Sequence, residues 1–228
     1  MLGPVRCCRP DCAATVRHFD ESVAQGDRQR CRAKGLDTRA RKLVGALGRL
    51  RIDGASILDV GSGLGLVSFE LLARGAATAT LCDASAAYLD AAREEAASRG
   101  LMDRIRIAEG DFVETAARLG AADVVVLDRS VCCYPAWQPL LEAAAARCTR
   151  ALGLTYPHHR PDIRAVLAFE NLRRRWTGDG FRAFVHDPSA MDGTVRRAGF
   201  RRISQSRTFA WKIDVYERLG NTHPSSSF

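Results

Sequence analysis

The sequence predicts an α/β protein with a doubly wound, mostly parallel sheet of seven strands. Three features support this prediction: short apolar runs alternate with helical segments, a glycine-rich loop follows the first run, and two adjacent strands close the chain. Repeated strand–helix units imply parallel strands with helices on both faces. Two strands with a short link must instead pair antiparallel, because a parallel pair needs a long crossover.

The elements follow one another in a regular order. Residues 1–53 have a helical pattern, in which residues 38–50 carry one apolar stripe. The next five strands are expected at 56–60, 79–82, 105–108, 123–127 and 152–156, with helices at 66–74, 86–98 and 139–150 between them. Helices at 163–176 and 189–198 then precede the antiparallel strands 201–206 and 208–217. We therefore predict an N-terminal helical cap at 1–53, a ligand-binding domain at 54–220 and a flexible tail at 221–228.

Composition and charge limit the choice of partner and compartment. The 228 residues carry a net charge of +8, but the cations are scattered along the chain, which favours a small-molecule partner over nucleic acid. No run reaches the roughly 18 apolar residues of a membrane span. The segment 1–12 has no apolar core typical of an export signal. We expect a cytoplasmic protein without a membrane partner, and the sequence does not indicate its oligomeric state.

The most informative segment is the glycine-rich loop after the first strand. Residues 57–65 read ILDVGSGLG, with glycine at every second position from Gly61 to Gly65. Glycine lets a loop turn tightly and lets its backbone approach a ligand, and the following helix offers free N–H groups to a carboxylate. A dinucleotide site needs G-x-G-x-x-G, and Leu66 occupies the place of its third glycine. The loop therefore argues against a nicotinamide or flavin cofactor.

Acidic residues follow the next two strands. Asp83 lies 22 residues beyond Gly61, and Asp111 stands in the segment EGDF at 109–112. A carboxylate at the first of these positions can accept hydrogen bonds from both ribose hydroxyls. Asp111 can meet an adenine amino group, with Phe112 against the ring.

Taken in this order at successive strand ends, these motifs resemble those of class I S-adenosylmethionine (SAM)-dependent methyltransferases, which have a Rossmann-like fold. The resemblance covers about residues 55–218 and implies SAM as the cofactor and S-adenosylhomocysteine as its product. The residues implied to bind the cofactor are Asp59, Gly61, Ser62, Gly63, Gly65, Asp83, Ala84, Gly110, Asp111, Phe112 and Asp128. The block LDR-x-x-CCYP at 127–135 and the helical cap are more loosely similar to magnesium-protoporphyrin O-methyltransferases.

Residues after the fourth and fifth strands should face the acceptor, because ligands of open α/β sheets lie beyond the carboxyl ends of the strands. The candidates for catalysis there are Cys132, Cys133, Tyr156, His158 and His159. The histidines could act as a base near neutral pH, or could simply cap the strand end in contact with solvent. His186 is a further candidate for the pocket, whereas His18 and His223 are expected on the surface. The Asn-Pro-Pro-Tyr motif of many amino-group methyltransferases is absent, which argues against DNA or protein amides as acceptors.

Eight cysteines leave three interpretations open. A reducing compartment favours free thiols or metal ligands over disulfides. The thiols could be incidental, or a zinc site could form from Cys7, Cys8 and Cys12 with His18 or Cys31, although this spacing fits zinc poorly. They could also bind a sulfur-containing or metal-bearing acceptor. We expect plain burial for Cys82 and Cys148, and whether any metal is bound stays open.

The sequence therefore predicts a SAM-dependent methyltransferase that acts on an oxygen or sulfur of a small molecule, with a thiol or dithiol as one possible acceptor. Three alternatives remain: methylation of a tetrapyrrole carboxylate, methylation of RNA, and a SAM-binding module without catalytic activity. The segment 163–189 bears on the acceptor, because Phe169, Leu172 and Trp176 form an apolar stripe at helical spacing. Such a stripe is typical of a core contact, or of a lid over an apolar acceptor.

Overall fold

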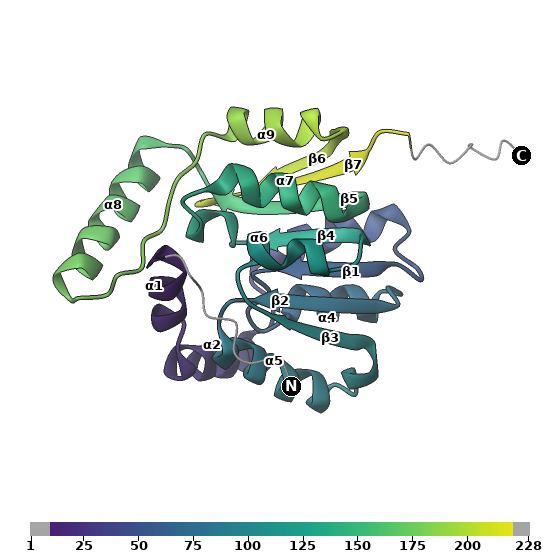
Figure 1. Ribbon diagram of the computed structural model, residues 1–228, viewed down its shortest axis with the longest axis horizontal. Coiled ribbons are helices and arrows are strands. Elements are labelled where there is room, and N and C mark those ends of the chain that lie inside the picture. Colours follow the sequence, from purple (N-terminus) through teal and green to yellow (C-terminus); the bar gives the residue numbers. More distant parts are fainter. Residues whose placement is uncertain (1–9, 221–228) are drawn as a thin grey trace, which may run out of the picture.

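One mixed sheet of seven strands forms the centre of the molecule (Figure 1). The computed structural model describes residues 10–220, with side chains from Cys12 onward. The strand order is β3-β2-β1-β4-β5-β7-β6, and β1 to β5 run parallel. β7 pairs antiparallel with both β5 and β6. The strands are β1 (Ser56–Val60), β2 (Thr78–Asp83), β3 (Ile105–Glu109), β4 (Ala122–Asp128), β5 (Cys148–Pro157), β6 (Phe200–Arg207) and β7 (Trp211–Arg218). The predicted fold class is confirmed.

Helices cover both faces of this sheet, as the doubly wound pattern requires. The α-helices are α1 (Pro10–His18), α2 (Glu21–Lys34), α3 (Thr38–Leu47), α4 (Leu66–Ala73), α5 (Ala86–Ser98), α6 (Phe112–Thr115), α7 (Trp137–Arg147), α8 (Pro161–Trp176) and α9 (Pro188–Arg197). Short 3-10 turns are η1 (Gly48–Leu50), η2 (Met102–Arg104), η3 (Ala116–Arg118) and η4 (Val131–Cys133). No helix among residues 10–220 is both long and apolar enough to cross a membrane.

Two large hydrophobic cores lie on opposite faces of the sheet, and a third, smaller cluster joins α2 to α5. Neighbouring residues of one strand point to opposite faces, so Val124 and Val126 of β4 join one core while Val125 and Leu127 join the other. The first core includes side chains of α3, α4 and α5, and the second includes those of α6, α7 and α9. Four of the five β4 positions from 124 to 128 are fully buried, which explains the continuous apolar run in the sequence.

The N-terminal helices have two different roles. The stripe predicted for residues 38–50 is buried: Leu43 and Leu47 of α3 pack onto the sheet opposite Gly153 of β5. In contrast, α1 lies near the chain that follows α8, at the end of the sheet where the parallel strands stop (Figure 1). The division at residue 53 stays a prediction, and the proposed tail at 221–228 lies outside the described residues.

One predicted helix boundary was wrong, and one of the two interpretations of α8 is excluded. The helix expected at 139–150 ends at Arg147, and Cys148 begins β5, because Cys148 already pairs with Ala122 of β4. The stripe of α8 is not a core contact: the exposed fraction is 63% for Phe169, 43% for Leu172 and 77% for Trp176. Helical spacing places apolar side chains on one face of a helix, but they are buried only where another element packs against that face.

Candidate active site

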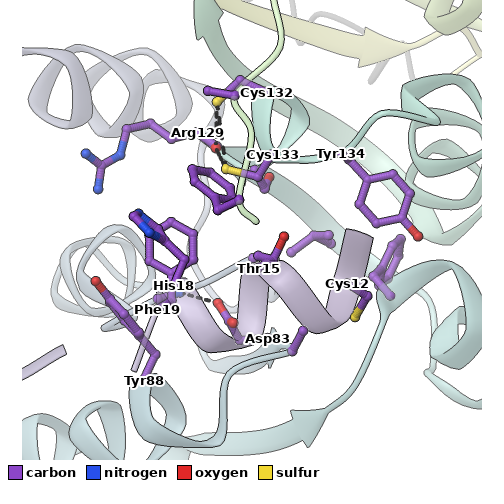
Figure 2. Close-up of a pocket in the computed structure, with 18 of the residues that line it drawn as sticks. Cys12, Thr15, His18, Phe19, Asp83, Tyr88, Arg129, Cys132, Cys133 and Tyr134 are labelled. Atoms are coloured by element: carbon purple, nitrogen blue, oxygen red, sulfur yellow. Dashed lines mark hydrogen bonds between the residues drawn. The ribbon is translucent and has the colours of Figure 1, made fainter. Parts of the chain in front are cut away.

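A cavity of about 400 Å³ lies at the carboxyl ends of β1, β2 and β4, where cofactor and acceptor were expected to meet. The glycine loop after β1 and the turn after β2 form its floor. Residues of α1 and of the chain segment after α8 form its opposite wall (Figure 2). Of the predicted site residues, ten line this cavity: Gly61, Gly63, Asp83, Ala84, Gly110, Asp111, Phe112, Asp128, Cys132 and Cys133.

The glycine loop is held tightly against neighbouring chain. Gly61 has φ +66°, and a Cβ atom built on it would lie 2.5 Å from Cβ of Ser130. Its N–H donates to the carbonyl of Cys82 on β2 at 2.8 Å. Only glycine fits here, because both the left-handed backbone and the close approach exclude a side chain.

Asp83 and the loop are joined by hydrogen bonds. The N–H of Gly63 donates to Oδ2 of Asp83 at 2.8 Å, and the N–H of Ser85 donates to Oδ1 at 2.9 Å. Burial raises the pKa of this carboxyl, and these two backbone donors offset part of the rise. The carboxylate is thus fixed in orientation at the wall of the cavity, as a ribose-binding group would need to be.

Asp111 has a partner that the sequence did not reveal. Its carboxylate accepts the N–H of Val113 at 2.9 Å as the N-cap of α6. The hydroxyl of Tyr134 donates to the same carboxylate, at 2.5 Å from Oδ1 and 2.7 Å from Oδ2. Tyr134 belongs to the CCYP block, so this block reaches the cofactor end of the cavity as well as the acceptor end.

Asp128 forms an ion pair with a buried arginine. Its Oδ1 accepts the hydroxyl of Thr155 at 2.6 Å and forms an ion pair with Arg39 of α3. The guanidinium of Arg39 lies 5.5 Å from the ring centre of Trp211, which also lines the cavity. This pair ties α3, β4 and β7 together below the site.

Several buried polar atoms beside the loop fit the amino-acid end of SAM. Oγ of Ser62, Oγ of Ser130 and Oδ1 of Asp59 are buried and have no hydrogen-bond partner among the described residues. Buried hydroxyl and carboxylate oxygens in native proteins are nearly always hydrogen-bonded. Of these residues Ser130 lines the cavity, so its hydroxyl is available to the polar amino-acid end of the implied cofactor, and the residues present fit that group.

Three of the residues implied for the cofactor do not line the cavity. Asp59 is buried beneath the loop, where its Oδ2 accepts the hydroxyl of Ser68 on α4 at 2.8 Å. Ser62 faces inward, and Gly65 adopts φ +73° as the N-cap of α4. Burial raises the pKa of Asp59 to about 7. These residues shape the loop from below.

The residues predicted to act as a base, Tyr156, His158 and His159, do not line the cavity. Tyr156 is buried, and its hydroxyl donates to Asp214 inside the sheet layer. His158 is also buried, with Nε2 3.1 Å from the carbonyl of Thr208, while His159 is exposed. β5 extends to Pro157 through its pairing with Trp211 of β7. Trp211 lines the cavity, but none of these three predicted residues does. His186 lies 3.1 Å from the carbonyls of Val131 and Tyr134 and does not line the cavity.

His18 takes the position that those residues were expected to fill. It was expected on the surface, but it lines the cavity from the end of α1. Its Nδ1 lies 2.6 Å from Oδ2 of Asp179, and its ring stacks on Phe181 with centroids 4.4 Å apart. Asp179 and Phe181 follow α8, so this contact joins segments 161 residues apart. No sequence pattern could have found it, because only the closure of the two segments brings them together.

The two thiols after β4 do line the cavity. Both donate to the carbonyl of Arg129, at 3.0 Å from Cys132 and 3.3 Å from Cys133, and their sulfurs are 4.0 Å apart (Figure 2). The contact between the two thiols lowers the pKa of Cys132, and the positive charge of Arg129 adds to the effect. The same contact raises the pKa of Cys133.

The remaining cysteines give no metal centre among the described residues. Within this part of the chain no group of three His, Cys, Asp or Glu side chains could hold a metal ion. Cys31, Cys82 and Cys148 are free thiols, and the last two are buried as expected. Cys12 lines the cavity but is disulfide-bonded, contrary to the expectation of free thiols. Cys7, Cys8 and His223 lie outside the described residues.

Comparison with known proteins agrees with this geometry. Residues 57–153 match the family described as "Methyltransferase domain". These residues form a methyltransferase domain. The matched segment contains the glycine loop, Asp83, Asp111 and the CCYP block, so the resemblance predicted from the motifs is confirmed.

Curated and solved relatives of the methyltransferase domain are more distant. A release factor glutamine methyltransferase of Chlorobaculum tepidum is 35% identical over 104 residues, which are 45% of this chain and 28% of that protein. The chain therefore spans little more than a quarter of the length of this curated relative.

Solved structures extend the similarity beyond the matched family. An O-methyltransferase family protein of Burkholderia thailandensis has a TM-score of 0.63 at 22% identity, over 78% of this chain and 56% of that one. Magnesium protoporphyrin IX methyltransferase of Synechocystis, solved with S-adenosylhomocysteine, has a TM-score of 0.69 at 17% identity, over 90% of this chain and 99% of that one. Both likenesses establish the class I methyltransferase fold.

Proposed function

We propose that the protein transfers a methyl group from SAM to an oxygen or sulfur of a small molecule and releases S-adenosylhomocysteine. The main supporting observation is that one cavity is lined both by the cofactor motifs and by the residues expected to face the acceptor. SAM would supply an electrophilic methyl group on a sulfonium. The protein's own residues would bind the two reactants, exclude water and accept a proton.

The cofactor end is assigned by residue type and position. Asp83 would accept the ribose hydroxyls, since both of its oxygens are already oriented by backbone N–H donors. Asp111 and Phe112 would meet the adenine, and the buried hydroxyl of Ser130 would meet the amino-acid end. Holding both reactants in line supplies much of the acceleration in a displacement of this kind.

His18 is our candidate for the proton acceptor. Its Nδ1 is held by Asp179, and its Nε2 has no partner among the described residues. The acceptor's proton would pass to Nε2 while its oxygen or sulfur attacks the methyl carbon, and Asp179 would stabilise the imidazolium formed. A base is required only when the acceptor is protonated, so an ionised thiol would not depend on His18.

Cofactor binding can be tested by titrating S-adenosylhomocysteine calorimetrically into wild type, Asp83→Ala and Asp90→Ala. Asp90 is the matched control, because its side chain is 69% exposed on α5 and is paired with Arg93, a neighbour on the same helix. We expect Asp83→Ala to lose about tenfold or more in affinity, the cost of two charge-assisted hydrogen bonds. An unchanged Kd for Asp83→Ala, or no binding by wild type, would refute the cofactor assignment.

Transfer can be tested with methyl-labelled SAM and three acceptors of different chemistry: dithiothreitol, catechol and protoporphyrin IX. Dithiothreitol represents the thiol class, for which Cys132 and Cys133 at the acceptor wall are the supporting observation. Protoporphyrin IX represents the tetrapyrrole carboxylate class, favoured by the fold likeness over 90% of the chain. With a turned-over acceptor, His18→Gln should lower the rate and His159→Gln should not, since His159 is exposed.

Two other functions predict different results in the same experiments. Methylation of RNA requires an affinity for RNA that falls steeply with salt. A SAM-binding module without activity would bind S-adenosylhomocysteine and leave every acceptor unmethylated. We expect neither outcome, and we expect no nucleic-acid or membrane partner for a protein that works on a small molecule.

A further inference from the structure

Arg129 is a cation at the cavity wall that forms no ion pair with a carboxylate of residues 10–220. It follows β4 directly, lines the cavity and is exposed, and its guanidinium forms no ion pair with any described residue. Figure 2 shows the side chain extended away from Cys132 and Cys133. The acids around it already have partners: Asp83 accepts two backbone N–H groups, and Asp128 is paired with Arg39.

The backbone of Arg129 is held in an unusual conformation. Its φ is +60°, in the left-handed region, and Arg51 is the one other non-glycine residue with positive φ in the described chain. The N–H donates to Oγ1 of Thr155 at 2.9 Å, and the carbonyl accepts both thiols of Cys132 and Cys133. Backbone strain of this kind persists where surrounding bonds enforce it, and it clusters at ligand-binding sites. These bonds fix the direction in which the side chain leaves the sheet.

A second arginine lines the same cavity from the lid side. Arg174 of α8 places its guanidinium 5.1 Å from the ring centre of Phe181. Its Nε is buried and has no hydrogen-bond partner among residues 10–220. One terminal nitrogen donates to Oδ1 of Asn171 at 3.4 Å, and stacking of this kind leaves the other in-plane N–H groups able to donate. α8 therefore offers a buried donor in addition to the exposed cation of Arg129.

Aromatic rings complete the surroundings of these cations. Phe19, Tyr88, Phe181 and Trp211 line the cavity. Phe19 meets Tyr88 edge-on with centroids 5.7 Å apart and Phe181 edge-on at 5.2 Å. A flat apolar ligand could pack against these rings while its charged group reaches an arginine.

We propose that the acceptor is an aromatic anion, and that Arg129 recognises its carboxylate, sulfonate or phosphate group with Arg174 as a second donor. This inference rests on the proposed function, because it assigns the substrate class of the same cavity. A planar guanidinium suits such groups, since it can donate two parallel hydrogen bonds to them.

The test uses two probes that differ only in charge, 2-naphthoate and 2-naphthamide. Their dissociation constants are measured by saturation-transfer NMR, with and without S-adenosylhomocysteine. The variants are Arg129→Gln, Arg129→Lys, Arg174→Gln and the control Arg49→Gln. Arg49 is exposed, unpaired among the described residues and away from the cavity, so its loss changes the net charge equally. Every Arg129 variant keeps a non-glycine side chain at the same φ, so backbone strain is matched.

We expect wild type to prefer the naphthoate by about tenfold or more, the value of a charge-assisted hydrogen bond. Arg129→Gln should abolish this preference, Arg129→Lys should keep part of it, Arg174→Gln should reduce it, and Arg49→Gln should leave it unchanged. Equal binding of both probes by wild type, no binding of naphthoate, or a preference that survives Arg129→Gln would overturn the inference.

The cofactor titration separates this inference from the proposed function. Binding of S-adenosylhomocysteine without a naphthoate preference would refute the anionic acceptor alone. Failure to bind S-adenosylhomocysteine would refute the cofactor assignment, and the titrations without it would still report on Arg129. A loss of S-adenosylhomocysteine affinity in Arg129→Gln with an unchanged naphthoate preference would assign the arginine to the cofactor's carboxylate and overturn our proposal.

Discussion

Replacement of Gly61 by alanine should damage both the stability of the protein and its affinity for the cofactor. An L-residue in the left-handed region costs roughly 1–2 kcal/mol, and Gly61 has φ +66°. The added Cβ would lie 2.5 Å from Cβ of Ser130, which must move together with its backbone. Overpacking of this kind costs about 1–3 kcal/mol. The expected loss in free energy of unfolding is therefore about 2–5 kcal/mol.

The two contributions can be separated with Ser130→Gly. This change removes the clashing atom but leaves the backbone penalty at position 61, so the double variant should recover about 1–3 kcal/mol relative to Gly61→Ala. Urea denaturation of the four proteins gives the free energies, and calorimetry gives the affinity for S-adenosylhomocysteine. Wild-type stability in Gly61→Ala would refute the steric reasoning, as would double-variant losses that are simply additive.

Three further predictions concern the acids of the site. Asp59→Asn should change how the free energy of unfolding depends on pH. Burial raises the pKa of the native carboxyl to about 7, so the contribution of Asp59 to stability falls as pH rises from about 4 to 7 and is constant above that range. Urea denaturation at several pH values should show that the variant lacks this slope. Tyr134→Phe should weaken S-adenosylhomocysteine binding roughly fivefold in calorimetry, because Asp111 loses a hydroxyl donor to both oxygens. Arg39→Met should lower the free energy of unfolding by about 3–5 kcal/mol, because it leaves Asp128 without its buried partner.

Each of these predictions has its own contradicting result. A pH–stability curve of Asp59→Asn parallel to that of wild type would show that the native carboxyl titrates normally. Unchanged affinity in Tyr134→Phe would show that Asp111 does not need the tyrosine for its position. If Arg39→Met with Asp128→Asn were no more stable than Arg39→Met alone, the cost would not come from an unpaired carboxylate.

The sequence by itself determined the sheet and the cofactor end of the site. Strand runs such as that of β4 are buried on both faces, so their composition is continuous and easy to detect. The glycine loop, Asp83 and Asp111 each follow a strand immediately, so the parallel order of the strands was enough to place them together. A local pattern is sufficient wherever neighbouring residues in the chain are also neighbours in the site.

Only the tertiary structure decided the acceptor end. Tyr156 and His158 were candidates because they lie at the end of a strand, but Tyr156 is hydrogen-bonded to Asp214 and His158 contacts the carbonyl of Thr208, so neither lines the cavity. His18 and Asp179 meet across most of the chain. The backbone of Arg129 is held by the hydrogen bond that its N–H donates to Thr155 and by those that its carbonyl accepts from the two thiols after it. These contacts depend on how distant segments close over the sheet, which local spacing does not encode.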